Sequence, residues 1–315
     1  MSAVAFIVLA HTDAPKVRRM LATLDGADVF LHCDRRTPHD VLAQMLPPRQ
    51  RRLTLVERLA PQRTSWSLVE AELRGVQAAL RHSNAEHLVV MSGACYPLVT
   101  LEALTDELAG WRGRSRFELN PIPYAGWSTH AHPDGGMWRF THRMVTINGN
   151  VIAVRGMPLW FGRREIPRGL ELYGSSQWKI YSRRHAQAAL DVLSRLEQLR
   201  YWRHAYIPDE TCVASVLKSP SLVGDLADSV EADFPWLIRW VPPTHHPLSL
   251  TIGDFPLLAA ARTGAFDSDP GEGHSPKLFA RKIGSGAAEL LNTIDRQLRD
   301  VDPEVATQPP DRPLR

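Results

Sequence analysis

The chain has 315 residues, of which 44% are hydrophobic and 23% charged, and its formal net charge is +3. Such a length and composition are ordinary for a globular enzyme with one large domain or two small ones. The charge is too small and the arginines too scattered for a nucleic-acid-binding surface, although they fit a site for an anionic cosubstrate. Cys33, Cys95 and Cys212 lack the spacing of zinc ligands or of a disulfide framework, which favours a reducing cytoplasm.

Strands and helices alternate through the first 120 residues. Strands are predicted at residues 4–9, 29–32, 53–56 and 87–91. Helices are predicted at 14–24 and 67–80, with Asp13 and Ser67 as candidate caps. The apolar run at 3–10 is too short to cross a membrane and lacks a basic leader. This alternation is typical of a nucleotide-binding α/β fold, whose ligands bind at the carboxyl ends of strands, where His11 and Asp34 fall.

The pattern changes after residue 120. Residues 120–170 are rich in proline, glycine and aromatic residues, as acceptor-binding loops are, and as irregular packed segments also are. Later strands are predicted at 178–181 and 236–241, and later helices at 184–199, 209–217, 251–262 and 286–298. The helix at 251–262 is predicted to start with a capping box formed by Thr251 and Asp254. Residues 266–275 are expected to form a flexible loop. We therefore divide the chain into a nucleotide-sugar-binding half (1–120), an acceptor-binding and catalytic half of the same domain (121–302) and a Pro-rich disordered tail (303–315).

Three short motifs in the second half carry the chemistry. Residues 173–178 read Tyr-Gly-Ser-Ser-Gln-Trp, residues 207–210 read Ile-Pro-Asp-Glu and residues 278–282 read Leu-Phe-Ala-Arg-Lys. They supply a tight turn, a paired carboxylate and a paired cation. Phe279 and Ala280 are expected to pack the last motif against the core, which would hold the Lys282 ammonium in a partly dry site. Transfer of a sugar from a diphosphate to a hydroxyl needs a base for the hydroxyl proton and positive charge for the leaving group.

Each feature also has a purely structural interpretation. Carboxylates in a first helical turn are favoured by the helix dipole, so Asp209 could cap its helix. The Arg281-Lys282 pair could be a solvated start of the last helix, although cations at that position favour an anion nearby. The glycine and serines at 174–176 could form only a turn, or could let the backbone approach a donor sugar. Trp66 could line a pocket or belong to the core, and the same choice is open for His11.

In their order along the chain, several segments resemble one enzyme family. The segments that carry the resemblance are residues 8–11, 32–34, 65–71, 91–93 with 96–98, 174–178, 208–210 and 279–282. Over about residues 4–285 the chain resembles a bacterial member of the core-2/I-branching β-1,6-N-acetylglucosaminyltransferase family, which also contains the peptide O-xylosyltransferases. The resemblance implies a GT-A-like fold, with a Rossmann-like, mostly parallel sheet flanked by helices. It also implies an inverting mechanism and a UDP-sugar donor.

The resemblance also implies roles for individual residues. Glu210 is expected to be the catalytic base, with Asp209 beside it. Val8 and Asp34 are expected near the uridine and Lys282 on the diphosphate. The other residues that we assign to the donor side are His11, Ser65, Trp66, Ser176 and Arg281. The residues that we assign to the acceptor side are Glu118, Arg139, Trp178 and Trp240.

No cofactor or divalent metal is expected. Most GT-A enzymes hold Mn²⁺ with a DxD carboxylate pair after the fourth strand, whereas residues 92–96 carry no carboxylate here, and Cys95 stands where the family usually has Asp. Asp267 and Asp269 spell DxD, but in a late loop. A second diphosphate-binding arginine of the animal members falls near His245 and His246, so a role for that loop stays open.

The sequence therefore predicts a cytoplasmic glycosyltransferase with N-acetylglucosamine or xylose as the most favoured sugar and a glycan or glycolipid as acceptor. Association with a membrane surface is left open. A non-catalytic nucleotide-sugar-binding or glycan-binding protein is the alternative, and Cys95 and the 245–246 loop would favour it. A glycoside hydrolase also uses carboxylates, but it would not need the cations at 281–282.

Overall fold

A seven-stranded sheet forms the centre of the molecule, with strand order β16-β6-β15-β4-β1-β2-β3. We describe a computed structural model in residues 3–48, 50, 52–240, 246–266 and 273–302. The strands of the sheet are β1 (Val4–Ala10), β2 (Asp28–Cys33), β3 (Leu53–Leu55), β4 (His87–Ser92), β6 (Ser115–Phe117), β15 (Lys179–Ser182) and β16 (Val230–Ala232). β15 is antiparallel to both of its neighbours, and the other pairs of adjacent strands are parallel. The fold is thus the predicted α/β type with a mostly parallel central sheet.

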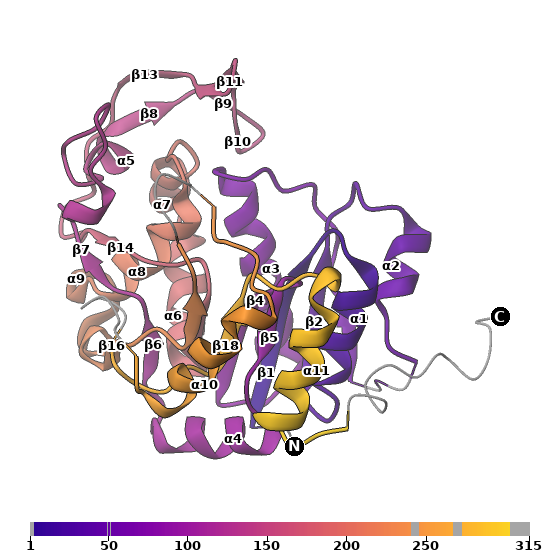
Figure 1. Cartoon of the computed structure of the whole chain (residues 1–315). Helices are drawn as coiled ribbons and strands as arrows, with labels where there is room; N and C mark the ends of the chain where they lie inside the picture. The colour runs from indigo at the N-terminus through magenta and orange to yellow at the C-terminus, as the bar shows by residue number, and fades with distance from the viewer. Residues whose placement is uncertain (1–2, 49, 51, 241–245, 267–272, 303–315) are drawn as a thin grey trace.

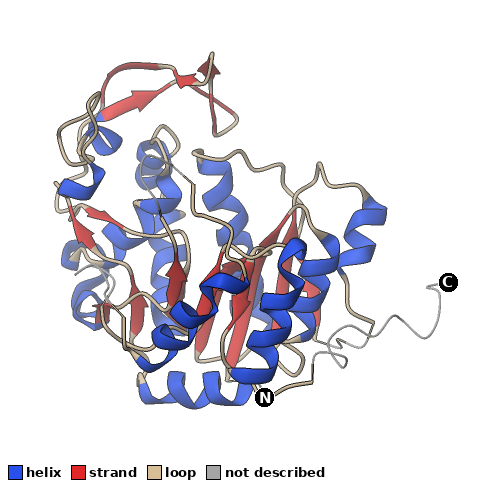
Figure 2. Cartoon of the chain, in the orientation of Figure 1, coloured by secondary structure: helices blue, strands red, loops and turns tan. Residues whose placement is uncertain are grey.

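Helices cover both faces of this sheet (Figures 1 and 2). One face carries α1 (Ala14–Ala22), α2 (His39–Met45) and α11 (Ala288–Gln297). The other carries α3 (Trp66–His82), α6 (Arg183–Leu193) and α8 (Cys212–Leu217). Every residue of β1 and β4 is buried, as expected for strands that are packed on both sides.

Shorter elements surround this core. The remaining helices are α4 (Leu101–Gly110), α5 (Trp138–Thr141), α7 (Leu196–Trp202), α9 (Pro220–Val223) and α10 (Phe255–Thr263). A second sheet has the order β17-β18-β5 and contains β17 (Trp236–Ile238), β18 (Phe279–Arg281) and β5 (Cys95–Pro97). A further pair joins β7 (Asn120–Pro121) to β14 (Tyr173–Gly174). The central sheet takes strands from both halves of the chain, since β15 and β16 lie after residue 120.

Residues 142–163 form an excursion of short hairpins, which we call the arm, at the top of Figure 1. It contains β8 (His142–Met144), β9 (Thr146–Ile147), β10 (Asn150–Val151), β11 (Ala153–Val154), β12 (Met157–Pro158) and β13 (Trp160–Arg163). Two of its turns are Asn148-Gly149 and Arg155-Gly156, where every φ lies between 51° and 79°. Positive φ at both central residues is what tight two-residue hairpins require. The sequence interpretation did not separate these hairpins from ordinary loops.

Two predicted helices differ from the observed ones. The helix predicted at 184–199 is split into α6 and α7, and the Ser194 hydroxyl binds the Leu190 carbonyl four residues back. The helix predicted at 209–217 begins with a 3₁₀ turn, η2 (Pro208–Glu210), before α8. Ile207 has a left-handed φ of 50°, so the chain enters this turn sharply.

Predicted caps were right at one position and wrong at two. Thr251 and Asp254 form the predicted capping box. The Asp13 carboxylate does not cap α1 but accepts a hydrogen bond from the Ser285 backbone at 2.8 Å, ahead of α11. The N-cap position of α3 is Ser65, and the Ser67 hydroxyl instead accepts from the Gln62 backbone at 2.9 Å.

None of the helices within the described residues combines the length and apolar character that crossing a bilayer requires. The predicted tail at 303–315 and most of the predicted loop at 266–275 lie outside the described residues.

Candidate active site

The three motifs of the second half meet in space. The Ser175 backbone N–H, in the first motif, donates to the carbonyl oxygen of Glu210 at 2.8 Å. The ring of Trp178, three residues later, lies 4.5 Å from the guanidinium carbon of Arg281. Residues 175–178 therefore connect the carboxylate motif to the cation motif. Along the sequence, these two motifs follow this segment by some 30 and 100 residues, respectively.

The Glu210 carboxylate is held but still accessible. Its Oε2 accepts a hydrogen bond from Nη1 of Arg139 at 2.9 Å, and the side chain is 36% exposed. Arg139 comes from α5, and its guanidinium stacks at 3.9 Å on the ring of Trp127. Within the described residues Oε1 of Glu210 makes no hydrogen bond, so one oxygen can receive a proton while the other is oriented by Arg139.

Gly174 makes this stacking possible. A Cβ at this position would lie 2.5 Å from the Trp127 ring, closer than van der Waals contact allows. The absence of a side chain thus lets β14 lie directly against Trp127, which in turn supports Arg139. The close approach predicted at this glycine is therefore made by a tryptophan ring. Contact with a donor sugar at 174–176 stays a prediction.

Asp209 is buried beside the exposed Glu210. Its Oδ1 has no hydrogen-bond partner within the described residues, and its side chain does not cap α8. Burial, with the charge of Glu210 as the second cause, raises the pKa of Asp209 to about 7. Lys179 acts in the opposite direction. The paired carboxylates thus have different surroundings, and only Glu210 faces the solvent.

A buried ionic group lies behind Asp209. Nζ of Lys179, on β15, lies 3.1 Å from Oε1 of Glu72, on α3, and the hydroxyl of Tyr181 donates to the same oxygen at 2.7 Å. Both charged side chains are only 1% exposed. Sequence analysis missed this group. A signal was present, because Glu72 lies between Val69 and Val76 on the apolar face of a predicted helix.

Arg281 and Lys282 do not begin the last helix. Arg281 ends β18, and α11 starts only at Ala288, so the argument from a helix terminus is wrong. The Arg281 guanidinium donates to the hydroxyl of Ser92 at the carboxyl end of β4. Phe279 and Ala280 are buried as predicted, but Lys282 is exposed, so its ammonium is not in the partly dry site that the sequence suggested.

Two donor-side predictions lie at the carboxyl ends of β1 and β2. His11 is exposed there, so it is not a core histidine. Asp34 accepts hydrogen bonds from the backbone and the guanidinium of Arg36. Burial raises the pKa of the Asp34 carboxyl, but the bonds from Arg36 outweigh it and hold the pKa below its usual value. Arg58, which sequence analysis missed, fixes this turn by donating to the Asp34 carbonyl at 2.7 Å.

Other donor-side predictions are buried. Val8 has no exposed surface and lies in the middle of β1, and Trp66 is only 2% exposed, which places it in the core. The Ser65 hydroxyl is also buried and accepts from the backbone of Val151 in the arm at 2.9 Å. Ser176 is half-buried, and its hydroxyl accepts from the Trp178 backbone at 3.2 Å.

The acceptor-side predictions lie in different surroundings. Glu118 directly follows β6, and its Oε1 accepts from Nδ2 of Asn120 at 2.8 Å. Trp240 is 52% exposed, whereas Trp178 is buried against Arg281, a residue assigned to the donor side. His246 lies 2.9 Å from the Arg63 guanidinium. His245 lies outside the described residues, as does the DxD sequence at 267–269.

The loop after β4 is bound by cations. Nζ of the buried Lys16 donates to the carbonyl oxygens of Gly93, at 2.7 Å, and Cys95. Arg281 binds Ser92 on the same loop. In the part of the chain that the structure describes, no three His, Cys, Asp or Glu side chains gather as metal ligands would. Independence from metal stays a prediction.

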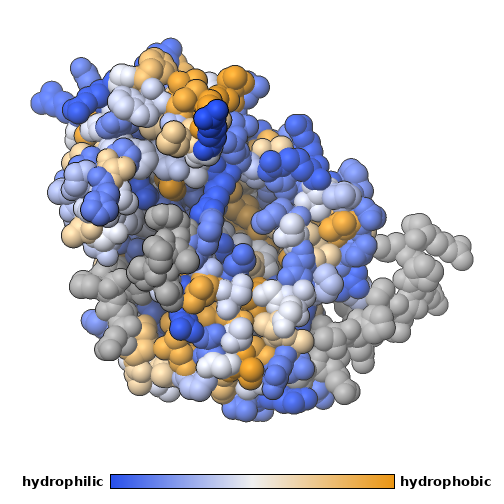
Figure 3. All heavy atoms as spheres, turned by 45° about the horizontal axis from the view of Figure 1, so that its top comes forward, coloured by the Kyte–Doolittle hydropathy of each residue, from blue (hydrophilic) through white to orange (hydrophobic). Residues whose placement is uncertain are grey.

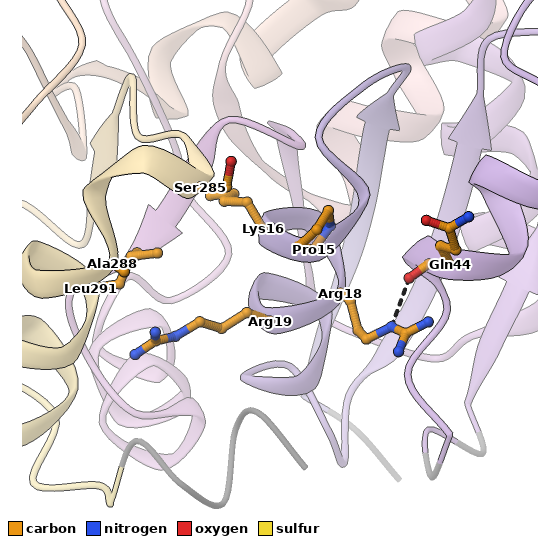
Figure 4. Close-up of a pocket in the computed structure, with 8 residues that line it drawn as sticks. All are labelled: Pro15, Lys16, Arg18, Arg19, Gln44, Ser285, Ala288 and Leu291. Atoms are coloured by element: carbon orange, nitrogen blue, oxygen red, sulfur yellow. Dashed lines mark hydrogen bonds between the residues drawn. The ribbon is translucent and has the colours of Figure 1, made fainter. Parts of the chain in front are cut away.

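A pocket lies between α1 and α11 (Figure 4). Lys16 lines it, but none of the predicted site residues does. Its arginines are already bound, since Arg18 donates to the Gln44 carbonyl at 2.6 Å and Arg19 pairs with Asp295 at 2.7 Å. The pocket therefore lacks the unpaired cations that a diphosphate would need.

A family model matches most of the chain. Residues 4–256 match the model described as Branch: Core-2/I-Branching enzyme. The chain belongs to the Core-2/I-branching enzyme family. This is a family of glycosyltransferases, which use a sugar donor and a glycan acceptor. The predicted family is thus confirmed, and the particular member of it is not.

Likeness to solved structures is weak. HddC from Yersinia pseudotuberculosis is 12% identical, with a TM-score of 0.29 over 58% of this chain and 78% of its own. A putative glucose-1-phosphate thymidylyltransferase from Bacillus anthracis is 11% identical, with a TM-score of 0.32 over 73% of this chain and all of its own. No curated protein sequence matches the chain. The family assignment therefore rests on the family model.

Proposed function

We propose that this family member is an inverting glycosyltransferase that uses a UDP-sugar and needs no divalent metal. The sugar is N-acetylglucosamine or xylose, and the acceptor is a hydroxyl of a glycan or glycolipid. The observation that carries the proposal is the arrangement around residues 175–178. There the backbone carbonyl of Glu210, whose carboxylate is partly exposed, accepts from Ser175, and the half-buried guanidinium of Arg281 lies over the ring of Trp178, so both residues contact one short segment.

The proposed reaction is a single displacement. The acceptor oxygen attacks the anomeric carbon while the bond from that carbon to the diphosphate breaks, and its electron pair leaves with UDP. Glu210 takes the hydroxyl proton through the carboxylate oxygen that Arg139 does not bind. Arg281 and Lys282 stabilise the negative charge that develops on the departing diphosphate.

Two observations support cations in place of a metal. The loop after β4 contains no carboxylate, and a guanidinium, that of Arg281, binds its Ser92 hydroxyl. We also place the reaction in the cytoplasm, because Cys33, Cys95 and Cys212 are buried free thiols.

Released UDP is the measurement that tests the proposal. The purified chain is incubated with a panel of UDP-sugars and simple glycan acceptors, with and without excess EDTA. Turnover should persist in EDTA, and Glu210→Gln should lower it by roughly 10²–10⁴-fold because the base is lost. The exposed Glu165→Gln is a matched control and should be unaffected.

The thermal midpoint with UDP distinguishes the outcomes. Stabilisation by UDP in wild type and in Glu210→Gln, with turnover only in wild type, supports the proposal. Stabilisation without turnover on any donor would favour the binding protein. Turnover that EDTA abolishes and Mn²⁺ restores would contradict the metal-independent mechanism.

A further inference from the structure

The arm carries an unusual amount of exposed apolar surface. Six of the ten large hydrophobic side chains that are exposed among the described residues lie in it. They are Ile147 (63% exposed), Val154 (52%), Met157 (70%), Leu159 (40%), Trp160 (54%) and Phe161 (56%). Single exposed hydrophobic residues are normal, but such a concentration on one small excursion indicates a docking surface.

The charge of the arm has one sign. Residues 142–163 contain Arg143, Arg155 and Arg163 and no Asp, Glu or Lys. All three arginines are exposed, and the guanidinium of Arg143 lies 5.5 Å from the ring of Phe161. Figure 3 shows hydrophobic side chains gathered at the top of the molecule beside strongly hydrophilic ones. The apolar surface and the positive charge are therefore on the same element.

Other residues attach the arm to the body of the molecule. Met144 and Val151 are buried, and the backbone of Val151 binds the side chains of Ser65 at 2.9 Å and Gln62 at 2.8 Å. The backbone of Met144 donates to the carbonyl of His204 at 3.0 Å. Since these contacts hold the arm, its exposed aromatic and aliphatic side chains are not needed for its attachment.

We propose that the arm docks on the surface of a membrane that contains anionic lipids. Aromatic and aliphatic side chains on a hairpin enter the interface between headgroups and acyl chains, and arginines beside them pair with lipid phosphates. A second copy of the chain fits less well, because a symmetric contact through this patch would bring three arginines against three others. The charge of the patch thus selects an anionic partner.

Docking would have one consequence for the site. The helix α5, which carries Arg139, ends at Thr141, immediately before the arm. An arm on a membrane would therefore set the Glu210 side of the site close to headgroups, where the hydroxyls of a glycolipid acceptor lie. This consequence rests on the proposed function, whereas the docking itself does not.

Co-sedimentation with vesicles tests the docking. The full chain is mixed with vesicles of phosphatidylcholine alone, or of phosphatidylcholine with phosphatidylglycerol. We expect binding to the anionic vesicles only, and a decrease with added salt. Met157→Ser with Phe161→Ser should abolish it. Arg155→Asn with Arg163→Gln should weaken it about 25-fold, since each arginine near an anionic surface contributes about fivefold. Asn is chosen at 155 because it tolerates the left-handed φ of that residue.

Matched changes elsewhere serve as controls. Leu55→Ser with Leu196→Ser removes two exposed apolar side chains, and Arg195→Gln with Arg200→Gln removes two exposed charges, all outside the arm. These variants should bind vesicles like wild type, and circular dichroism should show that all variants are folded. Equal effects of arm and control changes, or equal binding to neutral vesicles, would overturn the proposal. Failure of the wild-type chain to bind vesicles would also overturn the proposal. This outcome includes the case in which the chain forms a dimer that Met157→Ser with Phe161→Ser dissociates.

Discussion

Arg281 and Lys282 are neighbours in the sequence but have different surroundings. Arg281 is half-buried against Trp178, whereas Lys282 is exposed, so its stem contributes little to packing. If Lys282 acts on the leaving diphosphate, Lys282→Ala should lower kcat by roughly 10²-fold and raise the Kd for the UDP-sugar by a smaller factor. Steady-state kinetics and calorimetry separate the two constants.

The stem of Lys282 provides the control for this prediction. Lys282→Met keeps most of the stem and removes the charge, so it should be impaired about as much as Lys282→Ala. Activity restored by methionine would show that the side chain packs rather than reacts. The diphosphate would then have to be held by Arg281, which is already bound to Ser92.

Asp209 should make the stability of the fold depend on pH. Its pKa is raised to about 7, first by burial, from about 3.9 in an unfolded chain. Between these values the folded protein holds a proton that the unfolded chain has lost. The contribution of Asp209 to stability should therefore fall as pH rises from about 4 to about 7. Asp209→Asn stays neutral, so this variant should gain stability relative to wild type as the pH rises across this window.

Thermal midpoints at a series of pH values measure this gain. The difference between variant and wild type isolates Asp209 from the other titrating groups. A difference that does not change between pH 4 and 7 would mean that Asp209 is ionised in the folded protein.

At the scale of elements, the packing of β14 against Trp127, and through it against Arg139 of α5, depends on the absence of a side chain at Gly174. A Cβ on Gly174 would lie 2.5 Å from Trp127, on which Arg139 stacks. Gly174→Ala should therefore displace the ring, cost about 1–3 kcal/mol of stability and lower turnover, because the partner of Glu210 moves. Urea denaturation and UDP release measure the two effects.

Gly110 is the matched control for this change. It ends α4, and a Cβ there would have no heavy atom within 4 Å. Gly110→Ala should leave turnover unchanged and should not destabilise the fold, because alanine favours the helix. If Gly174→Ala were equally harmless, the stacked arrangement of Trp127 and Arg139 would not depend on this close approach.

Strands were easier to predict than helix ends. The runs that form β1 and β4 are apolar throughout because both faces are covered, and this pattern is visible without any tertiary information. The ends of α6 and the start of α8 depend on local bonding, namely the Ser194 hydroxyl and the left-handed Ile207. The Asp13 cap failed because its partner, Ser285, lies 272 residues away.

The same limit applies to the site at the scale of the whole molecule. Glu210 and Arg281 are candidates because short motifs surround them. Their contacts could not, because the bonds Glu210–Arg139 and Arg281–Ser92 join residues 71 and 189 positions apart. Motif order selected the candidate residues, and the fold decides which of them meet.

The buried group of Glu72, Lys179 and Tyr181 joins α3 to β15 directly behind these motifs. Lys179→Met should destabilise the fold by about 3–5 kcal/mol, because it leaves the Glu72 charge buried without a cation beside it. The combined change Glu72→Leu, Lys179→Met, Tyr181→Phe removes both charges and the hydroxyl, so it should be less destabilised than the single change. Urea denaturation at constant pH compares them.

A triple variant that is as unstable as the sum of its single changes would show that the three side chains stabilise the fold independently. If the triple variant recovers stability but not turnover, the role of the ionic group is instead to align β15 with Asp209 and Glu210. Such a role is consistent with the effect of Lys179 on the Asp209 carboxyl.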